Sequence, residues 1–284
     1  MTTKKMKRIV TFFVAVAMLV GTVSLFSCGK KSGKYVVLED NFGAENYAVG
    51  FRKGDDALAL KVQEILDEMI ADGKAGEIAK KWFDSDVMLR NVDFPRELKA
   101  SEDDTSLQYV LDKGELILGL DETFPPMGFR DEKGEIIGFD IDLATEVCSR
   151  LGVKLKLQPI NWNSKEMELS GKTIDCIWNG MSVDDERTEK LDLSKPYIAN
   201  NQIIIVSDES GIKTKADLAG KKIGAQTGSS AIGAMQADEA TYASFASLDQ
   251  YDSNDDAYLD LKAGRIDALV VDEVYGRYMI GNDQ

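Results

Sequence analysis

Residues 115–160, ELILGLDETFPPMGFRDEKGEIIGFDIDLATEVCSRLGVKLKLQPI, set the fold class of this 284-residue chain. The apolar run at 115–120 predicts a strand. A helix is predicted over 140–151, because its apolar residues recur at helical spacing and Gly152 follows its last turn. Residues 154–160 alternate as a second strand. This succession of strand, helix and strand is typical of an α/β protein.

Short strands and helices continue to alternate toward the C-terminus. Apolar runs predict further strands at four places, residues 174–180, 201–206, 222–226 and 266–272. One helix is predicted to begin after the turn at 227–230. Another is predicted over 255–263, with Asn254 as its N-cap and Gly264 after its end.

The N-terminal third has the same style of sequence. Two strands, 35–39 and 47–51, are predicted to flank a turn at Gly43. A strongly amphipathic helix follows over 56–72, and a shorter helix comes after it. Residues 85–104 are polar and lack periodicity, so we interpret them as a linker.

The first 27 residues have the pattern of a secretory signal. Basic residues come first, and an apolar run from Ile9 to Phe26 follows them. The run ends at Ser27-Cys28, which resembles the lipobox of bacterial lipoproteins, where the cysteine is acylated and becomes the new N-terminus. We therefore predict a lipoprotein signal peptide at 1–27 and a lipidated tether at 28–34. The alternative is an uncleaved transmembrane anchor; either would place the rest of the chain outside the cytoplasm.

Composition excludes several classes of function. The chain has no histidine, which excludes Ser-His-Asp and Cys-His catalysis and His-ligated zinc or haem. Its net charge is −15, and removal of the four basic residues of the signal leaves −19, which argues against nucleic-acid binding. Cys148 and Cys176 then remain, either as small buried hydrophobic residues or as a disulfide. No metal and no cofactor is predicted.

Four stretches, the first of them within 115–160, follow one another in an informative order. They are GLDETFPPMGFRDEKGEIIGFDIDLATEV (119–147), IDCIWNGMSVDDERTEKLDLSKPY (174–197), ADLAGKKIGAQTGSS (216–230) and LKAGRIDALVVDEV (261–274). With them, the chain from residue 106 onward resembles the polar amino acid-binding proteins of bacterial ABC importers, extracellular solute-binding protein family 3. The resemblance implies the α/β, two-lobed type II periplasmic-binding-protein fold, with two hinge crossover strands near 40–50 and 198–206.

Residues 35–84 resemble the C-terminal part of the same family, its return hinge strand and last two helices, although they come first here. This order predicts a circularly permuted chain in which 85–104 bridges the family's usual termini. Lobe 1 is then expected to comprise 43–200, and lobe 2 to comprise 35–42 plus 201–284, in a monomer. The alternative is a slice from a tandem array, whose N-terminal piece pairs with another copy.

The resemblance also assigns the groups that would hold an amino acid's carboxylate. Arg187 matches the family's carboxylate-binding arginine, and its planar fork suits that anion; the alternative is a surface arginine. Thr227 and Ser230 belong to a turn at a helix N-terminus, which would hold the carboxylate from the other lobe. The alternative for this turn is a plain helix cap.

Asp272 is assigned to the ammonium group. It ends a buried strand, where a carboxylate is costly unless paired, and the Gly180 carbonyl and Ser182 hydroxyl would complete the cation site. Its alternative role is N-cap of the helix that follows. The ligand side chain is expected to meet Asp121, Phe124 and Trp162. Core packing is the alternative for the two aromatic residues.

The resemblance thus implies a lipid-anchored receptor, at the cell surface or in the periplasm, that binds a free L-amino acid. By hinge closure it would deliver this ligand to the membrane permease subunits of an ABC importer, without catalysis. Asp121 favours a basic or amide side chain. The alternatives are a dehydratase of the arogenate or prephenate type, with Glu122 as general acid, a sensor domain, and a non-functional permutant.

Overall fold

The computed structural model of the chain describes residues 34–90, 92 and 98–283. The predicted signal peptide, Cys28 and most of the predicted tether lie outside the described residues. None of the helices in the described ranges has the length and apolar content needed to span a bilayer.

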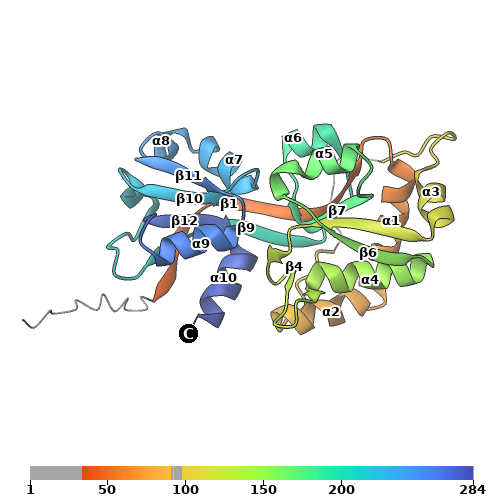
Figure 1. Cartoon of the computed structure of the whole chain (residues 1–284), viewed down its shortest axis with the longest axis horizontal. Helices are drawn as coiled ribbons and strands as arrows, with labels where there is room; N and C mark the ends of the chain where they lie inside the picture. The colour runs from red at the N-terminus through yellow and green to blue at the C-terminus, as the bar shows by residue number, and fades with distance from the viewer. Residues whose placement is uncertain (1–33, 91, 93–97, 284) are drawn as a thin grey trace, which may run out of the picture. The chain divides into compact units, whose positions relative to one another are not determined.

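Two long strands form the centre of a nine-stranded sheet in the described part of the chain (Figure 1). β1 (Tyr35–Arg52) and β9 (Ile198–Ser207) pair antiparallel, with Tyr35 opposite Ser207 and Tyr47 opposite Ile198. The sheet order is β11-β10-β12-β9-β1-β7-β2-β6, and β8 pairs with β1. The two predicted crossover strands are therefore confirmed.

One half of the sheet, here called lobe 1, continues from β1. Its strands are β7 (Cys176–Ser182), β2 (Glu115–Leu120), β6 (Lys154–Pro159) and β8 (Leu191–Leu193). Its helices are α1 (Asp56–Ala71), α2 (Lys74–Phe83), α3 (Ser106–Lys113), α4 (Phe139–Leu151), the 3₁₀ turn Trp162–Ser164, α5 (Lys165–Ser170) and α6 (Asp185–Lys190). A separate small sheet contains β3 (Thr123–Phe124), β4 (Gly128–Arg130) and β5 (Ile136–Ile137).

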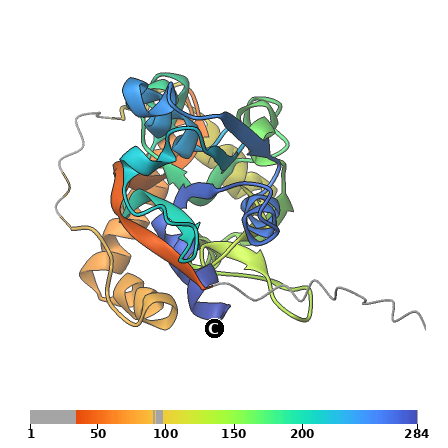
Figure 2. The ribbon, with the colours of Figure 1, turned by 90° about the vertical axis from the view of Figure 1, so that its left-hand side faces the viewer.

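The other half, lobe 2, continues from β9. Its strands are β12 (Ala268–Asp272), β10 (Lys222–Gln226) and β11 (Ser247–Tyr251). Its helices are the 3₁₀ turn Lys215–Leu218, α7 (Ser230–Ala237), α8 (Glu239–Tyr242), α9 (Asn254–Lys262) and α10 (Glu273–Asn282). The helices of lobe 2 lie on both sides of its strands (Figures 1 and 2).

Apolar periodicity explains how the helices pack. In α1 the residues at helical spacing from Leu58 to Met69 are buried, and they join a large core cluster of apolar residues. In α4 the buried face includes Cys148, and Gly152 ends the helix in the left-handed conformation that glycine adopts readily. Cys148 and Cys176 are both free and buried, so they are small core residues rather than a disulfide.

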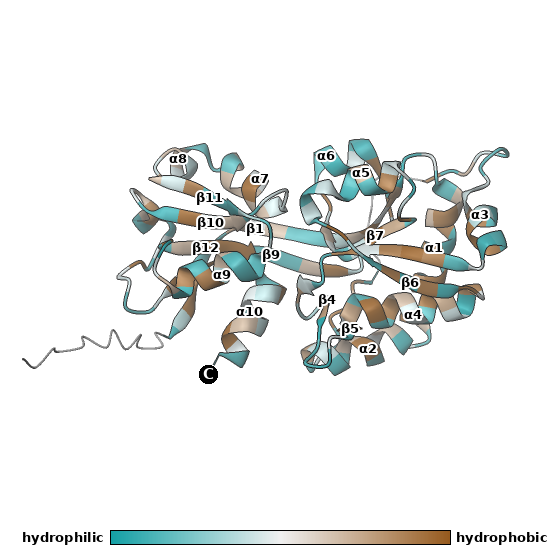
Figure 3. Cartoon of the chain, viewed as in Figure 1, coloured by the Kyte–Doolittle hydropathy of each residue, from teal (hydrophilic) through white to brown (hydrophobic). Residues whose placement is uncertain are grey.

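Polar residues are concentrated where β1 and β9 pass between the lobes, and both strands have hydrophilic segments there (Figure 3). The two ends of these strands are apolar and enter the cores of the lobes. A continuous sheet therefore carries a polar band at its middle, next to the ends of β2, β7, β10 and β12.

Several local predictions were wrong. Gly43 does not make a turn: β1 is continuous, and irregular register between Val37 and Ala44 absorbs the glycine. The N-cap of α9 is Ser253, whose side chain accepts from the Asp256 amide, and not Asn254. Strand β7 begins two residues later than predicted and extends to Ser182, so the predicted site residues Gly180 and Ser182 both lie inside it.

Candidate ligand-binding site

Five of the predicted ligand-binding residues line one small cavity between the ends of the strands. Its lining is Asp121, Phe124, Trp162, Asn179, Gly180, Gln226 and Asp272, and its volume is about 10 Å³. A cavity of this size is at the lower limit for a single water molecule. An amino acid could enter only if the two lobes moved apart.

Asp272 stands at the end of β12, and one of its carboxyl oxygens collects three hydrogen bonds. Oδ1 accepts from the Tyr47 hydroxyl at 2.6 Å, from Asn200 Nδ2 at 2.8 Å and from Gln202 Nε2 at 2.9 Å. Asp272 occupies the N-cap position of α10, but its side chain makes no capping hydrogen bond. The Asp272 carboxylate therefore accepts hydrogen bonds from side chains of the candidate site and does not cap α10.

Arg187 is buried, with 6% of its surface exposed, which excludes the alternative of a surface arginine. Its backbone N–H donates to the Asp184 side chain, which caps α6. Nη1 donates to the Ser182 carbonyl at 2.9 Å, and Nη2 donates to the Gly228 carbonyl at 3.3 Å. The guanidinium thus reaches from lobe 1 to the turn of lobe 2.

Lys165 adds a second cation here that sequence reasoning missed. Only 3% of it is exposed, and its Nζ donates to the Gly228 carbonyl at 3.1 Å and the Trp162 carbonyl at 3.3 Å. Nζ also lies 5.0 Å from the centre of the Trp162 ring. Burial, and then the charge of Arg187, lowers the pKa of Lys165 to about 8. Lys165 could have been suspected from the sequence, because it comes three residues after Trp162, a predicted site residue.

The turn at 227–230 contributes mainly through Ser230, the first residue of α7. Its hydroxyl shares a hydrogen bond of 2.9 Å with Ser182 Oγ and accepts from Gln202 Nε2 at 3.1 Å. The Thr227 amide donates to the Tyr251 carbonyl, and the Ser229 amide to the Gln226 carbonyl. Both of these amides are therefore engaged within lobe 2.

The predicted side-chain residues pack as well as line the cavity. Phe124 stacks on Tyr275, with ring centres 5.8 Å apart, and Trp162 belongs to a core cluster of lobe 1. Asp121 Oδ1 accepts from the amide and hydroxyl of Thr123, and Oδ2 accepts from Gln226 Nε2 at 2.6 Å. Core packing and exposure to the cavity therefore occur together.

Gly180 requires glycine. Its φ of +59° lies in the left-handed region, and a Cβ there would stand 2.7 Å from Phe124 Cε1. Asp140, which sequence reasoning did not assign, fixes this residue: Oδ2 accepts from the Gly180 amide, and Oδ1 from the Tyr197 hydroxyl, both at 2.8 Å. Burial raises the pKa of Asp140 to about 7.

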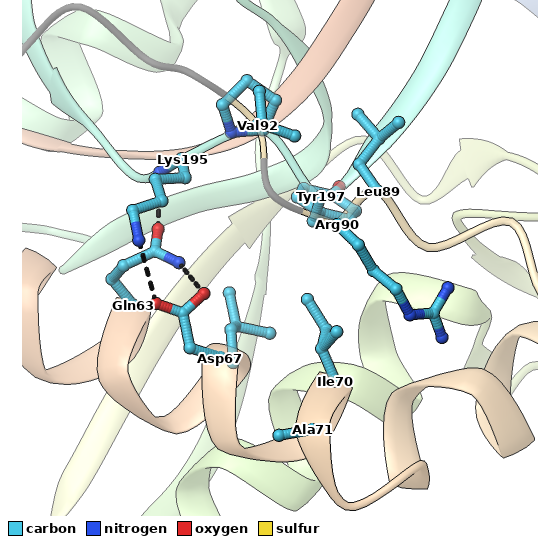
Figure 4. Close-up of a pocket in the computed structure, with 11 residues that line it drawn as sticks. Gln63, Asp67, Ile70, Ala71, Leu89, Arg90, Val92, Lys195 and Tyr197 are labelled. Atoms are coloured by element: carbon cyan, nitrogen blue, oxygen red, sulfur yellow. Dashed lines mark hydrogen bonds and ion pairs between the residues drawn. The ribbon is translucent and has the colours of Figure 1, made fainter.

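A larger cavity of about 510 Å³ lies away from these residues, against α1 (Figure 4). Three of its polar side chains are bound to one another: Gln63 Nε2 donates to Asp67, and Lys195 Nζ pairs with Asp67 Oδ2 at 3.1 Å. No predicted site residue lines it. Within the described ranges there is no cluster of three or more acidic or cysteine side chains placed to hold a metal ion.

Comparison with known proteins gives the family. Residues 116–261, about half of the chain, match the bacterial extracellular solute-binding proteins, family 3. The L-cystine-binding protein TcyJ of Escherichia coli (strain K12) is 34% identical over 181 residues, which are 62% of this chain and 66% of that protein. The lysine/arginine/ornithine-binding periplasmic protein of the same organism is 34% identical over 55% of this chain and 60% of its own length. The chain thus spans just under two thirds of these curated relatives.

Comparison with solved structures gives the same family of proteins. An ABC uptake transporter substrate binding protein from Streptococcus pneumoniae with bound histidine has a TM-score of 0.61 and 40% identity, over 64% of this chain and 75% of that one. The holo ArgBP of T. maritima has a TM-score of 0.57 and 36% identity, over 62% and 76%. These likenesses confirm the two-lobed type II fold. The chain belongs to the bacterial extracellular solute-binding proteins of family 3.

Proposed function

We propose that this protein binds a free L-amino acid between its lobes and delivers it to an ABC importer. The observation that carries the proposal is the joining of an anion site to a cation site. Arg187 contacts the Ser182 carbonyl, Ser182 Oγ contacts Ser230 Oγ, and Gln202 bridges Ser230 to Asp272. An amino acid presents a carboxylate and an ammonium at a fixed short separation, which matches such an arrangement.

The names of the relatives support the same ligand class. TcyJ is named for L-cystine, a Bacillus subtilis relative for arginine and a Salmonella typhimurium relative for histidine. Two of these three names specify a side chain that can carry a positive charge. With Asp121 in the cavity lining, they favour a basic ligand.

Binding would use the hinge formed by β1 and β9. The cavity is about 10 Å³ when Gln226 contacts Asp121 and Arg187 contacts the Gly228 carbonyl. We infer that these interlobe contacts break to admit the ligand and that the lobes close again around it. The ligand then favours the closed arrangement by its contacts to both lobes, and the importer recognises that form.

A screen of the twenty amino acids plus cystine by thermal shift tests the proposal, because a specific ligand raises Tm by mass action. Calorimetry then compares wild type with Arg187→Ala, which is expected to abolish binding of the amino acid that raises Tm most. Arg265→Ala is the matched control, since Arg265 is exposed and pairs with Asp260 far along α9. Undiminished affinity in Arg187→Ala would refute the assignment.

We further propose a circularly permuted single-chain fold with lobe 1 at 43–200 and lobe 2 at 35–42 plus 201–284. The central position of β1, between β9 and β7, supports it, because residues 35–52 then complete the sheet built by the rest of the chain. Residues 85–104 would bridge the family's usual termini. Gel filtration tests this: a monomer is expected, and a dimer or ladder without monomer would favour the swapped or tandem alternative.

We also propose lipid anchoring through Cys28, on the outer side of the cell membrane. The sequence pattern Ser27-Cys28 after an apolar run supports it. Incorporation of labelled palmitate in the native host tests the proposal, and Cys28→Ala is expected to abolish the label. Retention of the label in that variant would contradict acylation at this residue.

A further inference from the structure

Glu45 lies beside Asp272 and shares its hydrogen-bond donors. It belongs to β1, at the polar band between the lobes, and its Oε1 accepts from Asn200 Nδ2 at 2.7 Å and from Gln202 Nε2 at 2.9 Å. The same two nitrogens donate to Asp272 Oδ1 at 2.8 and 2.9 Å. Ser182 Oγ also donates to Glu45 Oε1, at 2.8 Å. The two carboxyl groups are therefore held side by side at the predicted ammonium site.

Two adjacent carboxylates repel each other, which favours a proton on the buried Asp272 unless a cation lies next to it. Burial, and then the charge of Glu45, raises the pKa of Asp272 well above its ordinary value. The groups that face the pair are the Tyr47 hydroxyl from β1, the two amides of β9, Ser182 of β7 and Ser230 of α7. All of these are neutral, because burial also raises the pKa of Tyr47 well above 10.

We propose that Glu45 is the second carboxylate of the cation site and that the pair exchanges its proton for the ammonium group of the bound amino acid. The inference rests on the proposed function and adds a specificity-determining residue to it. The released proton passes to solvent, and the ammonium N–H groups replace it between the carboxylates. A ligand that lacks the α-ammonium leaves the proton in place.

Glu45→Gln tests the inference with Glu39→Gln as the matched control, because Glu39 is exposed on the same strand. The probe is the amino acid that raises the wild-type Tm most in the screen of the twenty amino acids plus cystine, together with its desamino analogue. In Glu45→Gln we expect affinity for the amino acid to fall about tenfold or more, and affinity for the analogue to change less than about twofold. Glu39→Gln is expected to change neither.

Equal losses for both compounds, or no loss, would overturn the inference while the proposed function stands. If neither cystine nor any of the twenty amino acids raises Tm, the proposed function itself fails, so the two failures are distinguishable. Glu45→Asp keeps the charge and is expected to restore selectivity for the amino acid over its analogue.

A second measurement needs no variant. Calorimetry of the wild type in two buffers of different ionisation enthalpy, between about pH 5 and pH 7, counts the protons released on binding. We expect about one more proton for the amino acid than for its desamino analogue. Asp140, which contacts Gly180 and whose pKa is raised to about 7, contributes equally to both proton counts. Its contribution therefore cancels when the count for the analogue is subtracted from the count for the amino acid. An equal proton count for both compounds would overturn the exchange.

Discussion

Gln226 Nε2 donates a hydrogen bond of 2.6 Å to Asp121 Oδ2, joining the end of β10 in lobe 2 to the end of β2 in lobe 1. The oxygen of the same Gln226 side-chain amide, Oε1, accepts a hydrogen bond of 3.1 Å from Asn254 Nδ2. A neutral side chain of the protein thus contacts the carboxylate that is predicted to meet the ligand side chain. A ligand with a cationic side chain could replace it with a stronger, charge-assisted hydrogen bond.

Asp121→Asn is therefore expected to weaken binding selectively. Affinity for L-arginine should fall about tenfold to a hundredfold, because a hydrogen bond to a charged group contributes about 1.5–3 kcal/mol. Affinity for L-glutamine, measured by the same calorimetry, should stay within about threefold. Equal losses for the two amino acids would mean that Asp121 acts on the fold and not on the side chain of the ligand.

Gly180→Ala is expected to destabilise the protein by about 2–4 kcal/mol, because the added Cβ meets Phe124 and the backbone lies at positive φ. The measurement is the free energy of unfolding from urea titration. Gly233→Ala in α7 is the matched control: its Cβ would have open space, so an unchanged or slightly higher stability is expected. Similar values for the two variants would remove the steric argument for Gly180.

Because of Asp140, we expect the stability of the protein to fall as the pH rises. Its pKa is raised from 3.8 to about 7 in the folded protein, so the folded state binds a proton that the unfolded chain has lost. The stabilisation is complete below about pH 4 and is lost as pH rises to about 7, with a slope of up to about 1.4 kcal/mol per pH unit. Urea titrations at several pH values measure this slope.

Asp140→Asn should remove that part of the slope, whereas Asp112→Asn on the exposed face of α3 should leave it unchanged. A slope that persists in Asp140→Asn would assign it to other buried carboxyls, such as Asp255, whose pKa burial also raises.

Because of Lys165, we expect stability to rise with pH in the alkaline range. Its pKa is lowered from 10.5 to about 8 in the folded protein, so between these values the unfolded chain binds the extra proton. The free energy of unfolding should therefore rise with pH between about 8 and 10.5 in the wild type. Lys165→Met should flatten this rise. A rise of the same size in the variant would show that another group causes it.

Regular elements were predictable from local sequence, whereas the members of the candidate site were assigned by the family resemblance. The strand at 115–120 and the helix that ends before Gly152 follow from apolar spacing and a glycine stop, which depend on near neighbours alone. Short or irregular elements were not predictable in this way. The small sheet of β3, β4 and β5 has strands of two or three residues, too short for any periodicity.

The sequence by itself determined the residue types of the candidate site: an arginine after the strand predicted at 174–180, an aspartate that ends an apolar strand, and a Gly-Ser-Ser turn before a helix. Tertiary structure alone decided which groups meet them. Glu45, Tyr47 and Gln202 reach Asp272 from β1 and β9, and Lys165 reaches Gly228 from the other lobe. Such contacts join residues far apart in the chain, because antiparallel pairing of the crossover strands fixes their register, and no local pattern encodes that register.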